Sequence, residues 1–218
     1  MNTRNLVNFL LVTALIGGVA GLLISFFVQA EVYAANLSPF NFMEVIGVVL
    51  FNFILGVTFA VVSMTGFFAY LFIHRFGLSL FRGFWSTVQV GLIIFVLFDL
   101  VYFPYQAANG EVSLIWYILI ALALLAYSWM VAKKKAKETN KHAFIPALFF
   151  MIVITTVEWV PALQVEGTEY MWLMIAPLLA CNTYQLLKLH RITNKGKKEN
   201  ISAKQNSTSV KMKKVSKA

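Results

Sequence analysis

The sequence has few charged residues and a single cysteine, and each scarcity excludes a class of protein. Charged residues make up 12% and apolar residues 60% of its 218 residues, whereas roughly a quarter of the residues in a soluble domain are charged. A soluble fold of this length could not bury so much apolar surface. Because Cys181 is the only cysteine, the chain can form neither an internal disulfide nor a cysteine-based metal site.

The basic residues are confined to short polar stretches. All 18 Lys and Arg residues lie at Arg4, at Arg75 and Arg82, between Lys133 and Lys141, or from Lys188 onward. The connections at the opposite ends of the apolar runs contain no basic residue and carry Glu31, Glu44, Glu111, Glu166 and Glu169. This segregation is the positive-inside pattern of a multi-pass membrane protein. The net charge of +9 therefore indicates attraction of the basic loops and tail to anionic lipids, not binding of nucleic acid.

The apolar runs between these charges are long enough to cross a bilayer. A spanning helix needs about 20 apolar residues, because its backbone must satisfy its own hydrogen bonds in lipid. Six runs qualify, at 6–28, 43–73, 83–103, 113–132, 143–165 and 170–189. The sequence thus predicts an all-α, polytopic bundle of six transmembrane helices over residues 1–190, in the cell (plasma) membrane. Alternating the spans places both termini and every basic residue on the cytoplasmic side.

The second run is too long for one perpendicular crossing. We interpret it as a span to about Thr65 that continues as a tilted or interfacial extension to His74 and Arg75. The segment FGLSLFRGF, Phe76 to Phe84, would then lie at the cytoplasmic surface. We take three residues of this segment and the tryptophan that follows it as a candidate contact for a partner protein: Phe76, Phe81, Arg82 and Trp85.

Both ends of the chain need separate interpretation. Val28-Gln29-Ala30 resembles a signal-peptidase site after the first run, but that run is longer than the 7 to 15 apolar residues typical of a signal peptide. We therefore expect a retained helix, with cleavage as the alternative. Residues 191–218 are rich in Lys, Ser, Asn and Thr, a composition that predicts a disordered cytoplasmic tail.

Two carboxylates interrupt the apolar runs, Asp99 in FVLFDLVYF and Glu158 in ITTVEWVPA. Both fall on predicted helices that run outward, at comparable depth. A carboxylate inside a membrane is costly unless it is paired, protonated or hydrated, so both are candidates for a functional polar site. If the third and fifth helices touch, the two acids could share a proton or bind a polar ligand. The alternative is that both are hydrated near the outer interface.

The sequence has no pattern typical of catalysis or of cofactor binding. His74, His142 and His190 each lie beside basic residues at a predicted membrane edge, and no HExxH motif is present. A G-x-S-x-G motif and a glycine-rich nucleotide loop are also absent. We expect no metal, no cofactor and no enzymatic activity. The pair Gly17 and Gly21 instead gives the first helix a small-residue face, which we expect to pack within the protein.

Three stretches together resemble the KinB-signalling pathway activation protein (KbaA) family of spore-forming bacilli. They are MTGFFAYLFIHRFGLSLFRGFW with FVLFDLVYFPYQ, KHAFIPALFFMIVITTVEWVPALQV, and PLLACNTYQLL. The resemblance runs from the first helix to His190, and the basic tail extends beyond it. It implies a polytopic regulator that promotes signalling by a KinB-like membrane sensor histidine kinase in the phosphorelay that initiates sporulation. It implies no catalytic residues.

A second hypothesis comes from the residues alone. Asp99 and Glu158 could serve a small proton-linked carrier or ligand sensor. Such carriers often contain inverted repeats, and the first and last three predicted spans show no convincing similarity. An intramembrane enzyme acting on lipid or peptide is the third and weakest hypothesis.

Overall fold

Helices form the whole of the regular structure that is described. The computed structural model describes residues 3–37, 41–107, 112–163 and 169–190. In chain order these ranges contain α1 (Thr3–Val28), α2 (Ala30–Leu37), α3 (Phe42–Phe81), α4 (Trp85–Ala107), α5 (Leu114–Glu138), α6 (Phe144–Phe149), a π-helical segment (Phe150–Ile154), α7 (Thr155–Leu163) and a final helix over residues 169–190. The all-α prediction is confirmed for these ranges.

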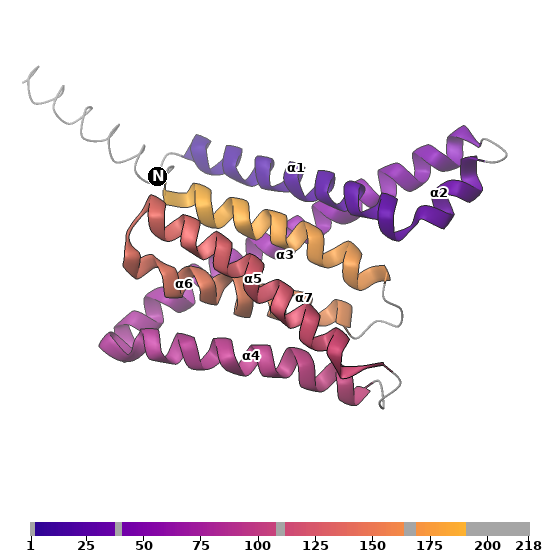
Figure 1. Ribbon diagram of the computed structural model, residues 1–218. Helices are drawn as coiled ribbons and strands as arrows, with labels where there is room; N and C mark the ends of the chain where they lie inside the picture. Colours follow the sequence, from indigo (N-terminus) through magenta and orange to yellow (C-terminus); the bar gives the residue numbers. More distant parts are fainter. Residues whose placement is uncertain (1–2, 38–40, 108–111, 164–168, 191–218) are drawn as a thin grey trace, which may run out of the picture.

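Four helical stretches of the described chain are long and apolar enough to cross a membrane: Thr3–Val28, Phe42–Ala107, Leu114–Glu138 and Lys141–Leu163. The stretch Phe42–Ala107 contains both α3 and α4, which turn back on each other at a 3-10 segment, Arg82–Phe84 (Figure 1). The division into six spans with both termini in the cytoplasm stays a prediction. The predicted tail, 191–218, lies outside the described residues.

The extension of the second run is a regular helix. α3 continues to Phe81, so most of the segment expected between two spans is helical, and the change of direction is confined to Arg82–Phe84. Gly77 explains why this helix can end so close to α4. A Cβ atom at Gly77 would lie 2.5 Å from the ring of Trp85, so only glycine allows that ring to rest on the helix backbone.

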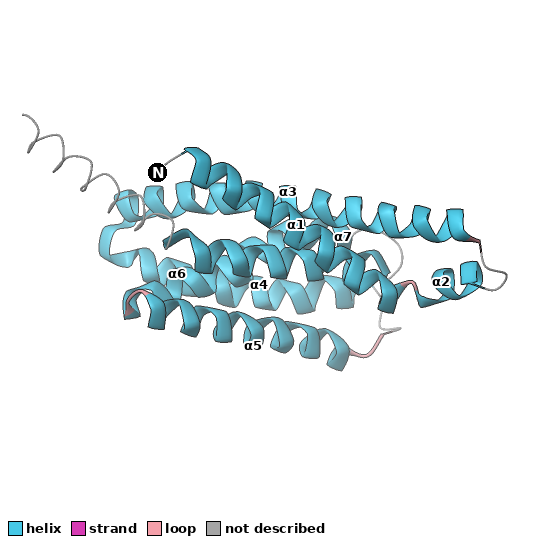
Figure 2. Ribbon diagram, turned by 90° about the horizontal axis from the view of Figure 1, so that it is seen from above, coloured by secondary structure: helices cyan, strands magenta, loops and turns pink. Residues whose placement is uncertain are grey.

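The helices run roughly along a common direction, with α2 at one end of the bundle (Figures 1 and 2). The start of α1, the α3–α4 turn, the α5–α6 connection and the end of the 169–190 helix all lie at the opposite end (Figure 1). We call this the basic end, because the described basic residues belong to these segments. The fold therefore gathers at one end the described basic residues, which are far apart in the sequence.

The helical path from α6 through α7 occupies the centre of the bundle. Phe150, Met151 and Ile152 of the π-helical segment are fully buried, and this path packs against α3, α4 and α5. Phe150 and Phe9 of α1 both contact the ring of Phe67 on α3, at centroid distances of 5.5 and 6.1 Å. Aromatic packing around this central path therefore joins helices from the two halves of the chain.

Glycines bring α1 and α3 together almost backbone to backbone. A Cβ atom at Gly17 would lie 2.6 Å from the carbonyl oxygen of Gly56, and one at Gly21 would lie 2.7 Å from the Gly56 Cα atom. Small residues permit such close approach between membrane helices, where dispersion contacts replace the hydrophobic effect as the driving force. The small-residue face predicted on the first helix thus packs within the protein.

Gly56→Ala tests this contact. The added methyl group would collide with the Gly17 carbonyl, so we expect the free energy of unfolding to fall by about 1–3 kcal/mol, the usual cost of overpacking. Gly47→Ala is the matched control, because a Cβ atom added to Gly47, on the same helix, would meet no neighbouring atom within 4 Å. Thermal unfolding of the purified protein in detergent gives the comparison. Equal melting temperatures for the two variants would contradict the close contact.

Candidate functional site

Glu158 lies inside the bundle and is held by an amide. It is on α7 and is 7% exposed. Its Oε2 atom accepts a hydrogen bond of 2.7 Å from Nδ2 of Asn182, on the 169–190 helix. Its Oε1 atom has no hydrogen-bond partner among the described residues. The carboxyl group is thus tied to a neighbouring helix through one oxygen and leaves the other unpaired.

Asn182 is the centre of a wider hydrogen-bond network. Its Nδ2 atom also donates to Oγ1 of Thr155 on α7, at 2.9 Å, and its Oδ1 atom accepts from Oγ of Ser63 on α3, at 2.7 Å. The same Ser63 oxygen accepts from Nε2 of Gln185, at 2.9 Å. All of these side chains are buried. The network, which we call the Asn182 network, joins α3, α7 and the 169–190 helix.

Backbone geometry on α3 makes room for the acid. Gly66 faces Glu158, and a Cβ atom at this position would overlap Oε1 of the carboxyl group. Next to Asn182 in the sequence, the Cys181 thiol donates to the Thr13 carbonyl of α1, at 3.4 Å. In the described ranges no ion pair involves Glu158, and no group of three or more His, Cys, Asp or Glu residues could hold a metal. Chemically, this arrangement can hold a proton or a polar ligand, or fix the register of three helices.

The structure does not join the two predicted acids. Asp99 is half-buried on α4, and across the described part of the chain no hydrogen bond links it to Glu158. Its neighbour Leu100 packs in a cluster with Trp159, the residue after Glu158, so the two helices are close. The pairing of Asp99 with Glu158 remains a prediction.

The four candidate partner-contact residues fall into two kinds. Phe76, Phe81 and Arg82 are exposed at the α3–α4 turn, where a partner could reach them. Trp85 is only 5% exposed, and its Nε1 atom donates to Nδ1 of His74, at 3.0 Å. Trp85 therefore braces the turn from inside, with its ring stacked on Phe81 at 5.9 Å.

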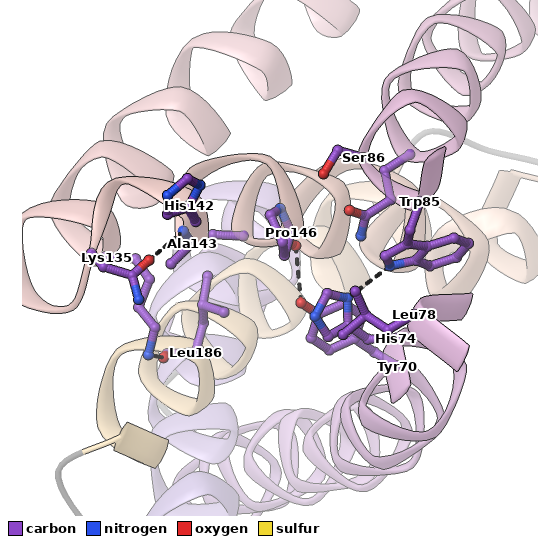
Figure 3. Close-up of a pocket in the computed structure, with 13 residues that line it drawn as sticks. Tyr70, His74, Leu78, Trp85, Ser86, Lys135, His142, Ala143, Pro146 and Leu186 are labelled. Atoms are coloured by element: carbon purple, nitrogen blue, oxygen red, sulfur yellow. Dashed lines mark hydrogen bonds between the residues drawn. The ribbon is translucent and has the colours of Figure 1, made fainter. Parts of the chain in front are cut away.

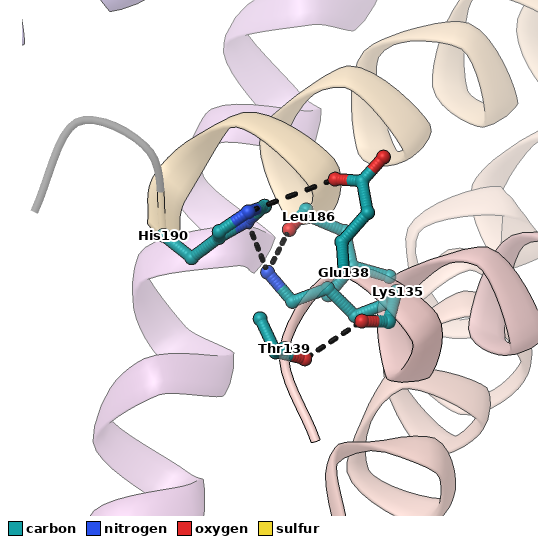
Figure 4. A network of polar contacts seen from close by, with 5 residues as sticks. All are labelled: Lys135, Glu138, Thr139, Leu186 and His190. Atoms are coloured by element: carbon teal, nitrogen blue, oxygen red, sulfur yellow. Dashed lines mark hydrogen bonds and ion pairs between the residues drawn. The ribbon is translucent and has the colours of Figure 1, made fainter. Parts of the chain in front are cut away.

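A second polar network closes the basic end (Figure 4). The Lys135 ammonium group donates to the Leu186 carbonyl, at 2.6 Å, and contacts Nδ1 of His190, at 3.1 Å. The other ring nitrogen of His190 lies 3.6 Å from a carboxylate oxygen of Glu138. The end of α5 is thus tied to the end of the 169–190 helix, although the sequence placed Lys135 and His190 only as separate residues at a membrane edge.

The Asn182 network was missed by reasoning from the sequence, which looked for charged groups. Its members are neutral polar residues inside apolar runs, such as the Asn and Gln of ACNTYQLL. Their presence in a 20-residue apolar stretch is itself a signal, because each must find a hydrogen-bond partner away from water.

Asn182→Leu tests the network. It keeps the branching of the side chain and leaves Ser63, Thr155 and Glu158 without the amide, so we expect a loss of about 1–3 kcal/mol in stability for buried groups left unpaired. Thr58→Val is the control, since that exposed hydroxyl bonds only to Ile54 of its own helix. Chemical or thermal unfolding in a mild detergent measures both variants, and an unchanged Asn182→Leu protein would refute the assigned role.

Backbone strain at the turn gives another test. Arg82 has φ 45° and ψ −116°, a conformation that glycine adopts more readily than other residues. Arg82→Gly should therefore raise the stability by about 1 kcal/mol. Arg75→Gly is the control: it removes the same positive charge, but from the regular part of α3, and it should lower the stability by about 1 kcal/mol because glycine is a poor helix former. Melting temperatures that shift in the same direction for both variants would count against strain at Arg82.

The comparisons with known proteins agree with the resemblance seen in the sequence. Residues 17–192 match the family KbaA, described as KinB-signalling pathway activation in sporulation. The curated KinB-signaling pathway activation protein of Bacillus subtilis (strain 168) is 35% identical over 199 residues, which cover 89% of this chain and 100% of that protein. No solved structure matches the chain. The matched region contains the Asn182 network and the α3–α4 turn.

Proposed function

Since this chain belongs to the KbaA family of KinB-signalling pathway activation in sporulation, we propose that it is a multi-pass protein of the cell membrane that activates a KinB-type sensor histidine kinase. The kinase feeds the phosphorelay that initiates sporulation. In this function the protein is a regulator that contacts another membrane protein and catalyses no reaction. The observation that carries the proposal is the family match over most of the chain.

The outward surface of the helices supports a membrane location. Large apolar side chains are exposed along the helices, among them Leu15 on α1, Ile54 on α3, Phe95 on α4 and Leu122 on α5. Exposed apolar surface of this extent is unfavourable in water and suits contact with lipid or with another membrane helix. The basic end would face the cytoplasm, where anionic lipids attract Lys and Arg.

Activation requires only a difference in binding between two states of the kinase. The described helices leave the exposed residues Phe76, Phe81 and Arg82 at the α3–α4 turn as a surface for such contacts. Because Trp85 and Gly77 brace this turn from behind, it offers a preformed surface, which limits the entropy lost on binding.

The second candidate is a ligand sensor or proton-linked carrier that uses intramembrane carboxylates. It is favoured by one observation, the unpaired and buried Oε1 atom of Glu158. Glu158→Gln and Asp99→Asn, made separately, distinguish the two candidates. A carrier needs a titrating carboxyl group and loses activity in at least one variant, whereas a helix-packing regulator keeps its activity in both.

The decisive experiment deletes the gene in the organism that carries it and measures the spore formation that depends on the KinB-type kinase. We expect a loss that is restored by the wild-type chain. The double variant Phe76→Ala, Phe81→Ala should restore spore formation at least about fivefold less than the wild-type chain does. That factor is the low end of typical coupling between sites. Phe27→Ala is the control, because Phe27 is 81% exposed in the last turn of α1, and that helix ends away from the basic end (Figure 1).

Protein levels in membrane fractions must be equal for that comparison. Crosslinking within the membrane provides the second readout, and we expect the kinase to be recovered with the wild-type chain and less with the double variant. Normal kinase-dependent sporulation in the deletion strain, together with no recovered kinase, would refute the proposed function.

A further inference from the structure

A cavity of about 420 Å³ opens at the basic end of the bundle (Figure 3). Its walls come from both connections at this end: His74, Trp85 and Ser86 at the α3–α4 turn, and Lys135, Asn140 and His142 at the α5–α6 connection. Cavities of roughly 300–1,000 Å³ are typical of sites for small molecules. The cavity is separate from the Asn182 network, because none of the polar side chains of that network lines it.

Gln89 marks the inner wall of this cavity. It lines the cavity from α4 and is fully buried, yet neither Nε2 nor Oε1 has a hydrogen-bond partner among the described residues. A buried amide without partners costs roughly 1–3 kcal/mol, and nearly all buried polar atoms in folded proteins are paired. An amide that both donates and accepts, at the wall of a cavity, is suited to a hydroxyl group, which can do the same in return.

The rest of the polar lining favours an anion. Lys135, whose ammonium group also contacts the Leu186 carbonyl and His190, adds a positive charge, and no Asp or Glu is among the lining residues in the described ranges. Nδ1 of His74 accepts from Trp85, so its ring proton is on Nε2 and is available for donation. Oδ1 of Asn140 already accepts the Ala143 N–H group, which leaves its amide hydrogens as donors. Ser86 adds a hydroxyl group.

We propose that this cavity binds a phosphate ester that carries a hydroxyl group, as in a glycerol phosphate moiety. The donors hold the oxyanion, to which Lys135 contributes a nearby positive charge, while Gln89 exchanges hydrogen bonds with the hydroxyl. The ligand then bridges the α3–α4 turn and the α5–α6 connection. Two sources supply this chemistry at the cytoplasmic side of the proposed topology: a soluble phosphate ester and the headgroup of phosphatidylglycerol.

Binding is tested with the full chain purified in nanodiscs of phosphatidylcholine. The probes are sn-glycerol 3-phosphate in solution and, in separate nanodiscs, phosphatidylglycerol. A ligand at about 100 times its Kd should raise the Tm by about 5–10 °C. A rise with the soluble probe identifies a soluble ligand, and a rise with phosphatidylglycerol alone identifies a lipid headgroup.

Variants of one helix locate the effect. Gln89→Leu removes the unpaired amide, so the protein without probe should be at least as stable as the wild type while the rise in Tm disappears. Gln89→Glu keeps the shape, repels the oxyanion and should also abolish the rise. Gln106→Leu is the control on the exposed far end of α4, where Gln106 bonds to Tyr102, and it should keep the full rise.

Two results would overturn the proposal. One is an unchanged Tm of the wild-type chain with both probes, supported by equilibrium dialysis that detects no bound glycerol 3-phosphate. The other is a rise in Gln89→Leu and Gln89→Glu equal to that of the wild type, which would show that any binding occurs elsewhere. Neither readout depends on the kinase. The proposed function can therefore fail while this site is confirmed, and the site can fail while the proposed function is confirmed.

Discussion

The arrangement of the bundle depends on the hydrogen bonds made by the side chain of Asn182. Its amide meets Ser63, Thr155 and Glu158, which lie on two other helices. In the proposed membrane location, apolar helices can slide and rotate against one another at little cost, because lipid and Leu side chains offer similar surroundings. A buried amide with three defined partners removes that freedom, since any shift leaves polar atoms unpaired. Glu158 is tolerated in the interior because it is part of this arrangement.

Close backbone contacts complete what the Asn182 network begins. Gly17, Gly21 and Gly56 let α1 lie directly on α3, and the buried π-helical segment fills the centre between α3, α4 and α5. Gly66 and Gly77 play the same part for Glu158 and Trp85. In each case the missing side chain of a glycine provides the space for a neighbouring group, so packing in this protein is decided as much by small residues as by large ones.

The basic end combines the features that a regulator needs. Its two connections are held on their inner side by the Trp85–His74 and Lys135–Leu186 hydrogen bonds. They are exposed where Phe76, Phe81 and Arg82 face outward. The cavity lined by Gln89 lies between them. A ligand in that cavity and a partner on that surface would therefore act on the same turn, and they would be coupled if each contacts two states of the turn differently.

The sequence by itself determined that the protein is helical, where most long helices lie and that the basic residues stand apart from the acidic ones. These properties depend on local composition, because hydropathy and charge are read residue by residue along the chain. The continuation of α3 to Phe81 was missed, since the support for it comes from Trp85 across the turn. Only the tertiary structure decided that Glu158 meets Asn182 and that Gln89 faces a cavity. Ser63 and Asn182 are 119 positions apart, and helical periodicity does not specify which faces of distant helices meet.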